Sequence, residues 1–149
     1  MNEKYMNLAL EMAKKGYEKG EVPIGAVVVL NGEVLSAEHN RTEELKDPTA
    51  HAELLAIKKA SEKIGDFRLK GAELYVTLEP CPMCAGAAIN ARVSEIIFGA
   101  FDPVKGALGS VTNIYTFNFP NKPQIYSGVK EKESLTLLKD FFSEKRNNK

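Results

Sequence analysis

Short β-rich runs alternate with segments of helical periodicity along most of the chain, and this alternation limits the architectures open to it. Ile24–Leu30 and Glu33–Glu38 are β-rich and flank Asn31-Gly32, a strong hairpin signal. Further strands are expected at Leu74–Leu78, Glu95–Gly99 and Gln124–Tyr126. Strands that alternate with helices favour right-handed crossovers and parallel pairs. We therefore predict an α/β fold, a three-layer α/β/α sandwich around a five-stranded mixed sheet that is antiparallel only at the first hairpin.

Four helices complete this prediction. Apolar residues recur at helical spacing over residues 3–19, and Gly20 follows as a stop signal. Asp47-Pro48 offers an N-cap followed by proline in the first helical position, which predicts a helix to about Lys63. Pro82 opens a third helix, to about Arg92, and a fourth covers roughly residues 133–146.

The last helix combines an apolar stripe with a basic end. Leu135, Leu138 and Phe142 share one face, which we expect to pack on the core. From Asn121 to Lys149 the chain carries seven basic and four acidic residues, a net charge of +3. We expect the basic end of this helix to reach phosphate groups, although a solvated amphipathic helix explains the same pattern.

Length and composition exclude several classes of protein. A chain of 149 residues predicts a single domain, residues 1–149. Lys+Arg and Asp+Glu are 20 each, so no net charge draws the chain to nucleic acid or membrane. The longest apolar run near the start, Ala26–Leu30, is far shorter than a membrane span, and charged residues interrupt the N-terminus. We therefore expect a cytoplasmic protein with no membrane partner.

The two cysteines form a C-x-x-C pair, Cys81 and Cys84, that opens a predicted helix. Residues three apart lie on one helical face, and a helix N-terminus favours the thiolates that bind metal. His51 also precedes a helical segment and is the natural third ligand. A His/Cys/Cys set leaves one position open, which is typical of catalytic zinc. We predict one Zn²⁺ per subunit.

Glu53 lies two residues after His51, and such residues do not share a helical face. The two side chains can converge only if the metal lies off the end of the helix, which a first-turn position allows. Glu53 would then contact the activated water without binding the metal, as a proton shuttle. Acid–base catalysis of this kind contributes roughly 10²–10⁴ in rate.

Each of these residues also has a simpler possible explanation. The C-x-x-C pair could be a redox pair, but His51 and Glu53 would then have no role. A purely structural zinc needs a fourth ligand, for which only His39 remains besides Glu53. His39 itself is best interpreted as a satisfied or partly exposed histidine.

The pattern H-x-E followed by P-C-x-x-C is the signature of zinc deaminases. Beyond it, the stretch from Val22 to Ser110 resembles the bacterial tRNA-specific adenosine deaminase family of the cytidine deaminase-like superfamily. The matching segments are Glu21–Val27, Asn40-Arg41, Asp47–Glu53, Leu74–Cys81, Met83–Ala87, Phe98–Ala100 and Gly106–Ser110.

This resemblance implies a cytidine deaminase-like fold, zinc on His51, Cys81 and Cys84, and proton transfer by Glu53. It also implies that Asn40, the backbone N–H of Ala52, and Asp102 contact the substrate or orient the water. The family pairs subunits through the region after Cys84, so a homodimer is implied, with no organic cofactor. The sequence departs from the family in two places: Phe101 replaces a residue that is often polar, and Pro120–Lys122 replaces an Asn-His-Arg-like run.

The resemblance implies an enzyme, a hydrolase acting on a cyclic amidine C–N bond. Its reaction would convert adenosine to inosine at the wobble position of a tRNA anticodon loop, with zinc-activated water and Glu53 as the proton shuttle. One alternative is a deaminase of a free base, nucleoside or nucleotide of the guanine or cytidine type. Another is a non-catalytic, zinc-stabilised nucleic-acid-binding module.

Overall fold

The computed structural model describes residues 2–147, so Lys149, counted above in the C-terminal charge, lies outside the described residues. In chain order the elements are α1 (Glu3–Glu18), β1 (Gly25–Leu30), β2 (Glu33–His39), α2 (Thr42–Leu45), α3 (Ala52–Ile64), β3 (Glu73–Leu78), α4 (Pro82–Asn90), β4 (Glu95–Ala100), the 3₁₀ helix η1 (Ile114–Thr116), β5 (Gln124–Tyr126) and α5 (Glu131–Asn147). In the described part of the chain, no helix is both long and apolar enough to span a bilayer.

The strands form one mixed sheet in the order β2-β1-β3-β4-β5. β3, β4 and β5 are parallel, whereas β1 is antiparallel to both β2 and β3. The prediction that the sheet is antiparallel only at the first hairpin is therefore wrong. The crossover through α3 does give β2 and β3 the same direction, but β1 lies between them and runs opposite to both.

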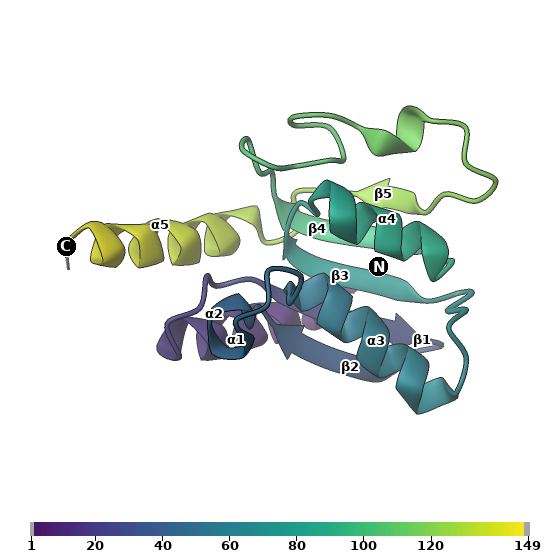
Figure 1. The fold of residues 1–149 in the computed structure, drawn as a ribbon, viewed down its shortest axis with the longest axis horizontal. Coiled ribbons are helices and arrows are strands. Elements are labelled where there is room, and N and C mark those ends of the chain that lie inside the picture. Colours follow the sequence, from purple (N-terminus) through teal and green to yellow (C-terminus); the bar gives the residue numbers. More distant parts are fainter. Residues whose placement is uncertain (1, 148–149) are drawn as a thin grey trace.

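Helices cover both faces of this sheet (Figure 1). Because side chains alternate along a strand, Val28, Val76 and Phe98 face the cluster formed with α3 and α4. Their neighbours Val27 and Tyr75 face the opposite cluster, formed with α1. The predicted α/β sandwich with a five-stranded mixed sheet is confirmed.

The first hairpin closes where Asn31-Gly32 predicts it. Asn31 and Gly32 have φ values of 51° and 77°, and a type I′ turn requires positive φ at both central positions. The turn matches the twist of the two strands, so β1 and β2 pair directly.

The helix predicted from Asp47-Pro48 begins at Ala52 instead. The Asp47 carboxylate accepts hydrogen bonds from the backbone N–H of Thr49, at 2.8 Å, and from its hydroxyl, at 2.7 Å. Asp47 therefore closes a local turn rather than capping the helix. This correction makes His51 the N-cap of α3.

The apolar stripe of α5 is placed differently from the prediction. Phe141 is buried, but Leu135 and Phe142 remain 46% and 45% exposed. Together with Leu138 these two side chains line a pocket rather than the core. The short helix α2 was not predicted, because four residues are too few to show a helical period.

Candidate metal centre and active site

The first turns of α3 and α4 meet at the end of β3. His51 is the N-cap of α3 and Cys81 the N-cap of α4, and both have extended backbone. Neither side chain caps its own helix, so both are free to turn toward a shared point. Pro82 follows as the first residue of α4, where its missing N–H costs no helical hydrogen bond.

Three potential metal ligands converge there. The ligand atoms of His51, Cys81 and Cys84 lie within 4.8 Å of one another. The His51 Nδ1 atom is 3.5 Å from the Cys81 sulfur and 3.6 Å from the Cys84 sulfur. Cys84 is buried, whereas the other two side chains are half-buried. The structure thus unites the three residues into a group that can hold a metal ion.

The electrostatics of the group favour anionic sulfur at Cys81. Hydrogen bonding from Cys84, helped by His51, lowers the pKa of Cys81 to about 4 despite its partial burial. Cys84 is the donor to Cys81 and is buried, so the pKa of its thiol is raised. Hydrogen bonding to Cys81 also raises the pKa of His51. Protons shared in this way are the ones that a metal ion displaces when it binds thiolates.

Glu53 lies in the first turn of α3, next to this group. Its side chain is only 4% exposed, and burial raises the pKa of Glu53 to about 7. His51 and Glu53 line the same pocket, because His51 stands just before the helix and Glu53 just inside it. A carboxyl group with a pKa near neutrality can both accept and donate a proton at physiological pH.

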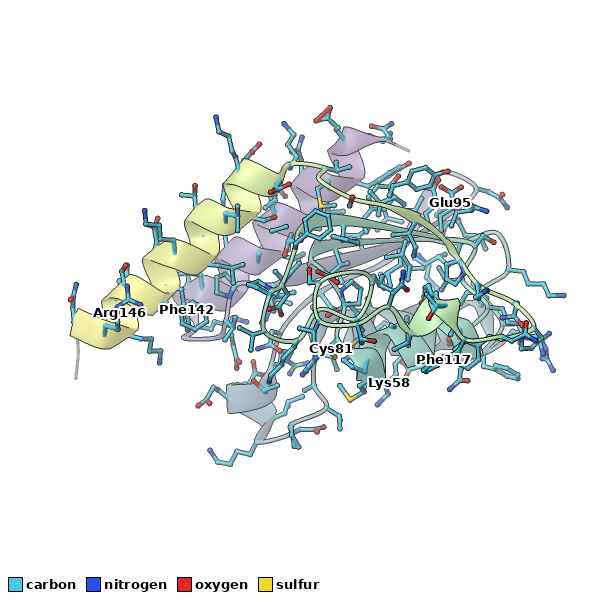
Figure 2. The ribbon with its side chains drawn as sticks, turned by 90° about the horizontal axis from the view of Figure 1, so that it is seen from above. Lys58, Cys81, Glu95, Phe117, Phe142 and Arg146 are labelled. Atoms are coloured by element: carbon cyan, nitrogen blue, oxygen red, sulfur yellow. The ribbon has the colours of Figure 1, made fainter. Side chains whose placement is uncertain are left out.

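A pocket of about 640 Å³ opens over the group, within the size range of small-molecule sites. Its wall combines the metal-capable side chains with loop 101–105 and the exposed stripe of α5. In Figure 2, α5 lies beside α1, with Arg146 near the C-terminal end of α5 and Phe142 about one turn before it. The lining residues are Val22, Ile24, Asn40, Thr42, Pro48, His51, Glu53, Leu78, Glu79, Cys81, Phe101, Asp102, Pro103, Val104, Lys105, Leu135, Leu138 and Phe142.

Two of the three predicted substrate contacts line this pocket. Asn40 is buried, and its side-chain amide donates to the Thr42 hydroxyl at 3.2 Å. Asp102 accepts hydrogen bonds on Oδ1 from the backbone N–H groups of Val104 and Lys105. Ala52 is fully buried and is not among the lining residues.

Sequence reasoning gave no role to Glu79, which is buried at the base of loop 102–110. Burial acts to raise its pKa, but hydrogen bonds from Ser110 and from backbone N–H groups outweigh this and lower it. Glu79 belongs to the matching segment Leu74–Cys81, yet its hydrogen-bond partners lie 23 to 31 residues further along the chain, so no local signal could identify them.

Comparison with known proteins gives a consistent picture. The family described as MafB19-like deaminase matches residues 1–146. A tRNA-specific adenosine deaminase of Bacillus subtilis (strain 168) is 49% identical over 149 residues, covering 99% of this chain and 92% of the relative. The similarity therefore extends well beyond the stretch Val22–Ser110.

Solved structures agree with the sequence comparison. One, from "Biochemical and Structural Studies of A-to-I Editing by tRNA:A34 Deaminases at the Wobble Position of Transfer RNA", matches with a TM-score of 0.86 and 47% identity, covering 92% of this chain and all of the other. A guanine deaminase from Nitrosomonas europaea has a TM-score of 0.78 at 21% identity, covering 96% of this chain and 85% of the other. At that identity the second match shows a shared fold alone.

Proposed function

The chain belongs to the family of tRNA-specific adenosine deaminases, and we propose on this premise that it deaminates adenosine to inosine at the wobble position of a tRNA anticodon. The observation that carries the proposal is the convergence of a His/Cys/Cys group and a buried glutamate in one pocket. The same four residues form the zinc deaminase signature.

The donor set fits zinc in both chemistry and spacing. Tetrahedral zinc with its usual bond lengths holds a sulfur and a nitrogen ligand about 3.6 Å apart, and the two S···N distances are 3.5 and 3.6 Å. We propose that His51, Cys81 and Cys84 hold one Zn²⁺. Zinc bound there supplies the Lewis acid that activates a water molecule.

Glu53 performs the proton transfers in this proposal. It takes up the two protons of the attacking water one after the other, passing the first to the base nitrogen and the second to the departing amine, so adenosine and water yield inosine and ammonia. Its burial supports this role, because the carboxyl group can change protonation state near neutral pH.

The pocket wall supplies the proposed substrate contacts. The Asn40 amide nitrogen donates to the Thr42 hydroxyl, and we propose that the carbonyl oxygen of the same side chain contacts the nucleotide. The backbone N–H of Ala52 belongs to the first turn of α3, where helical N–H groups lack intrahelical partners, and we propose that it orients the base or water. Asp102 contacts the nucleotide beside the target.

An RNA substrate needs cationic contacts, and these are local in a chain with no net charge. Lys105 lines the pocket, and Lys145 and Arg146 lie in the last turn of α5. In Figure 2, Arg146 lies at the far end of the helix whose Phe142 borders the pocket. An anticodon loop is single-stranded, so its base is extruded at little cost. A tRNA substrate and a reduced cysteine pair both favour a cytoplasmic location.

The proposed function is tested by nucleoside mass spectrometry on tRNA incubated with the protein. We expect inosine to form in a tRNA with adenosine at the wobble position, and no detectable turnover of free adenosine, guanine or cytidine. The same tRNA with guanosine at that position is the control. Comparable kcat/KM on free nucleoside and on tRNA would replace this function with a small-molecule deaminase.

We also propose that residues 1–149 form one domain and that this domain pairs with a second copy through α4. On α4, Met83 is exposed and Gly86 is half-buried, and a Cβ at Gly86 would meet no atom within 4 Å. Because Gly86 has no side chain, the backbone of a second copy can approach α4 closely here, as the self-complementary contact of a two-fold dimer requires.

The dimer is tested by sedimentation at micromolar protein. The wild type should sediment at twice the 16.4 kDa chain mass. Gly86→Arg should shift it to the monomer, with little change in Tm, because position 86 faces open space within the chain. A monomeric wild type, or a dimeric Gly86→Arg, contradicts pairing through this side of α4.

A further inference from the structure

The Glu79 carboxylate is a buried group to which the proposed reaction gives no role. It lies between β3 and Cys81 and is only 2% exposed. Its Oε1 accepts hydrogen bonds from the backbone N–H of Asp102, at 3.0 Å, and from the Ser110 hydroxyl. Its Oε2 accepts from the backbone N–H groups of Leu108, at 2.9 Å, and Ser110, at 3.1 Å. One carboxylate thus gathers four donors from a single loop.

This loop forms a wall of the pocket. Residues 101–105 all line the pocket. Backbone hydrogen bonds join the segment that contains Glu79 to the residues on either side of this stretch. The backbone N–H of Glu79 donates to the carbonyl oxygen of Ala100 at 2.8 Å, and the backbone N–H of Ala107 donates to the carbonyl oxygen of Pro80 at 2.9 Å. The loop is therefore tied to the residues that lead directly into Cys81.

Gly106 allows the close approach of loop and carboxylate. A Cβ at this position would overlap the carboxylate of Glu79 and the backbone of Asp102. Glycine is required there because the loop backbone passes directly over the buried side chain. The loop backbone therefore both packs against the Glu79 carboxylate and donates hydrogen bonds to it.

We propose that Glu79 is a positioning residue, which fixes the pocket wall of residues 102–105 relative to Cys81 and so sets where an RNA substrate is held. This inference rests on the proposed function for its substrate. Glu79 is not a second proton carrier or metal ligand, because each of its oxygens already accepts two hydrogen bonds.

The carboxylate is needed because every partner but one is a fixed backbone donor. Glutamine has one acceptor oxygen and one NH₂ group, which only donates. If the NH₂ group takes the place of Oε2, it faces the backbone N–H groups of Leu108 and Ser110, and both of these donors lose their acceptor. If it faces Asp102 instead, the Ser110 hydroxyl can rotate to accept, but the Asp102 N–H loses its partner. Glu79→Gln therefore releases the 102 end of the loop first.

The test combines steady-state kinetics on an anticodon stem-loop with hydrogen exchange. Glu79→Gln should raise KM about tenfold, the equivalent of one lost charged hydrogen bond, with kcat within about threefold and zinc content unchanged. Amide exchange should accelerate in residues 101–105. An unchanged KM accompanied only by a lower Tm would show a merely structural role and overturn the proposal.

Two serine variants provide a matched comparison and remain informative if Glu79→Gln does not fold. Ser110→Ala removes one donor to Glu79 and should raise KM about threefold. Ser36→Ala removes a buried hydroxyl that donates to Ala56 at 2.7 Å, away from the pocket, and should leave KM unchanged. Equal KM values in the two variants would overturn the proposal.

The exchange measurement separates this inference from the proposed function. If wild-type protein forms no inosine, the proposed function fails, and hydrogen exchange still decides whether Glu79 holds the loop. Faster exchange confined to residues 101–105 in Glu79→Gln supports the anchoring role, and unchanged exchange overturns it.

Discussion

Glu53→Gln is expected to lower kcat on tRNA by about 10²–10⁴-fold, the usual contribution of a positioned acid–base group. Glutamine keeps the size of the side chain but cannot carry a proton between water and the leaving amine. Glu53 lies beside the His/Cys/Cys group without belonging to it, so zinc should stay near one ion per chain. Single-turnover kinetics and metal analysis on the same preparation check both parts.

Glu62→Gln is the matched control for this substitution. Glu62 lies on the same helix, α3, and is exposed to solvent. The Glu62→Gln variant should have the kcat, KM and zinc content of the wild type. If Glu53→Gln loses zinc in proportion to its activity, Glu53 is a ligand and the proton-transfer role is wrong.

Cys84→Ala is expected to abolish both zinc binding and turnover. Loss of a residue that hydrogen-bonds to a metal ligand typically lowers metal affinity about 10–100-fold, so loss of one of the three proposed ligands should lower it further. Cys84 is fully buried, and no other cysteine besides Cys81 is present to replace it. Metal analysis of protein purified without chelator should find close to no zinc, with activity at least about 100-fold lower.

Chelation and reconstitution of the wild type form the control. Wild-type protein stripped of metal should lose activity and regain it with zinc, whereas Cys84→Ala should not respond. A redox role for Cys81 and Cys84 predicts the opposite, with activity that follows thiol oxidation and ignores zinc. Stoichiometric zinc and normal turnover in Cys84→Ala would exclude this metal centre.

The metal-capable residues and the hairpin could be predicted from sequence because their signals are chemical or local. Thiol and imidazole groups near helix starts indicate a metal site wherever the rest of the chain lies. Asn31-Gly32 readily adopts the positive φ values that the turn needs. Each of these signals depends on a few neighbouring residues.

The start of α3 shows where a local signal is ambiguous. Asp47 can cap either a helix or a turn with the same side-chain oxygen. Its bonds to Thr49 complete a turn, which moves the helix start to Ala52. The shift matters for the site, because it turns His51 into an N-cap whose imidazole points off the helix end toward the cysteines.

The sequence by itself therefore determined which residues are able to bind a metal ion, most of the strands and helices, and the family. The tertiary structure alone decided that β1 lies between β2 and β3, that the stripe of α5 borders the pocket, and that Glu79 organises a loop up to 31 residues away. The physical reason is that residue type and backbone preference act locally. Strand order, helix orientation and the partners of a buried charge depend on how distant surfaces pack.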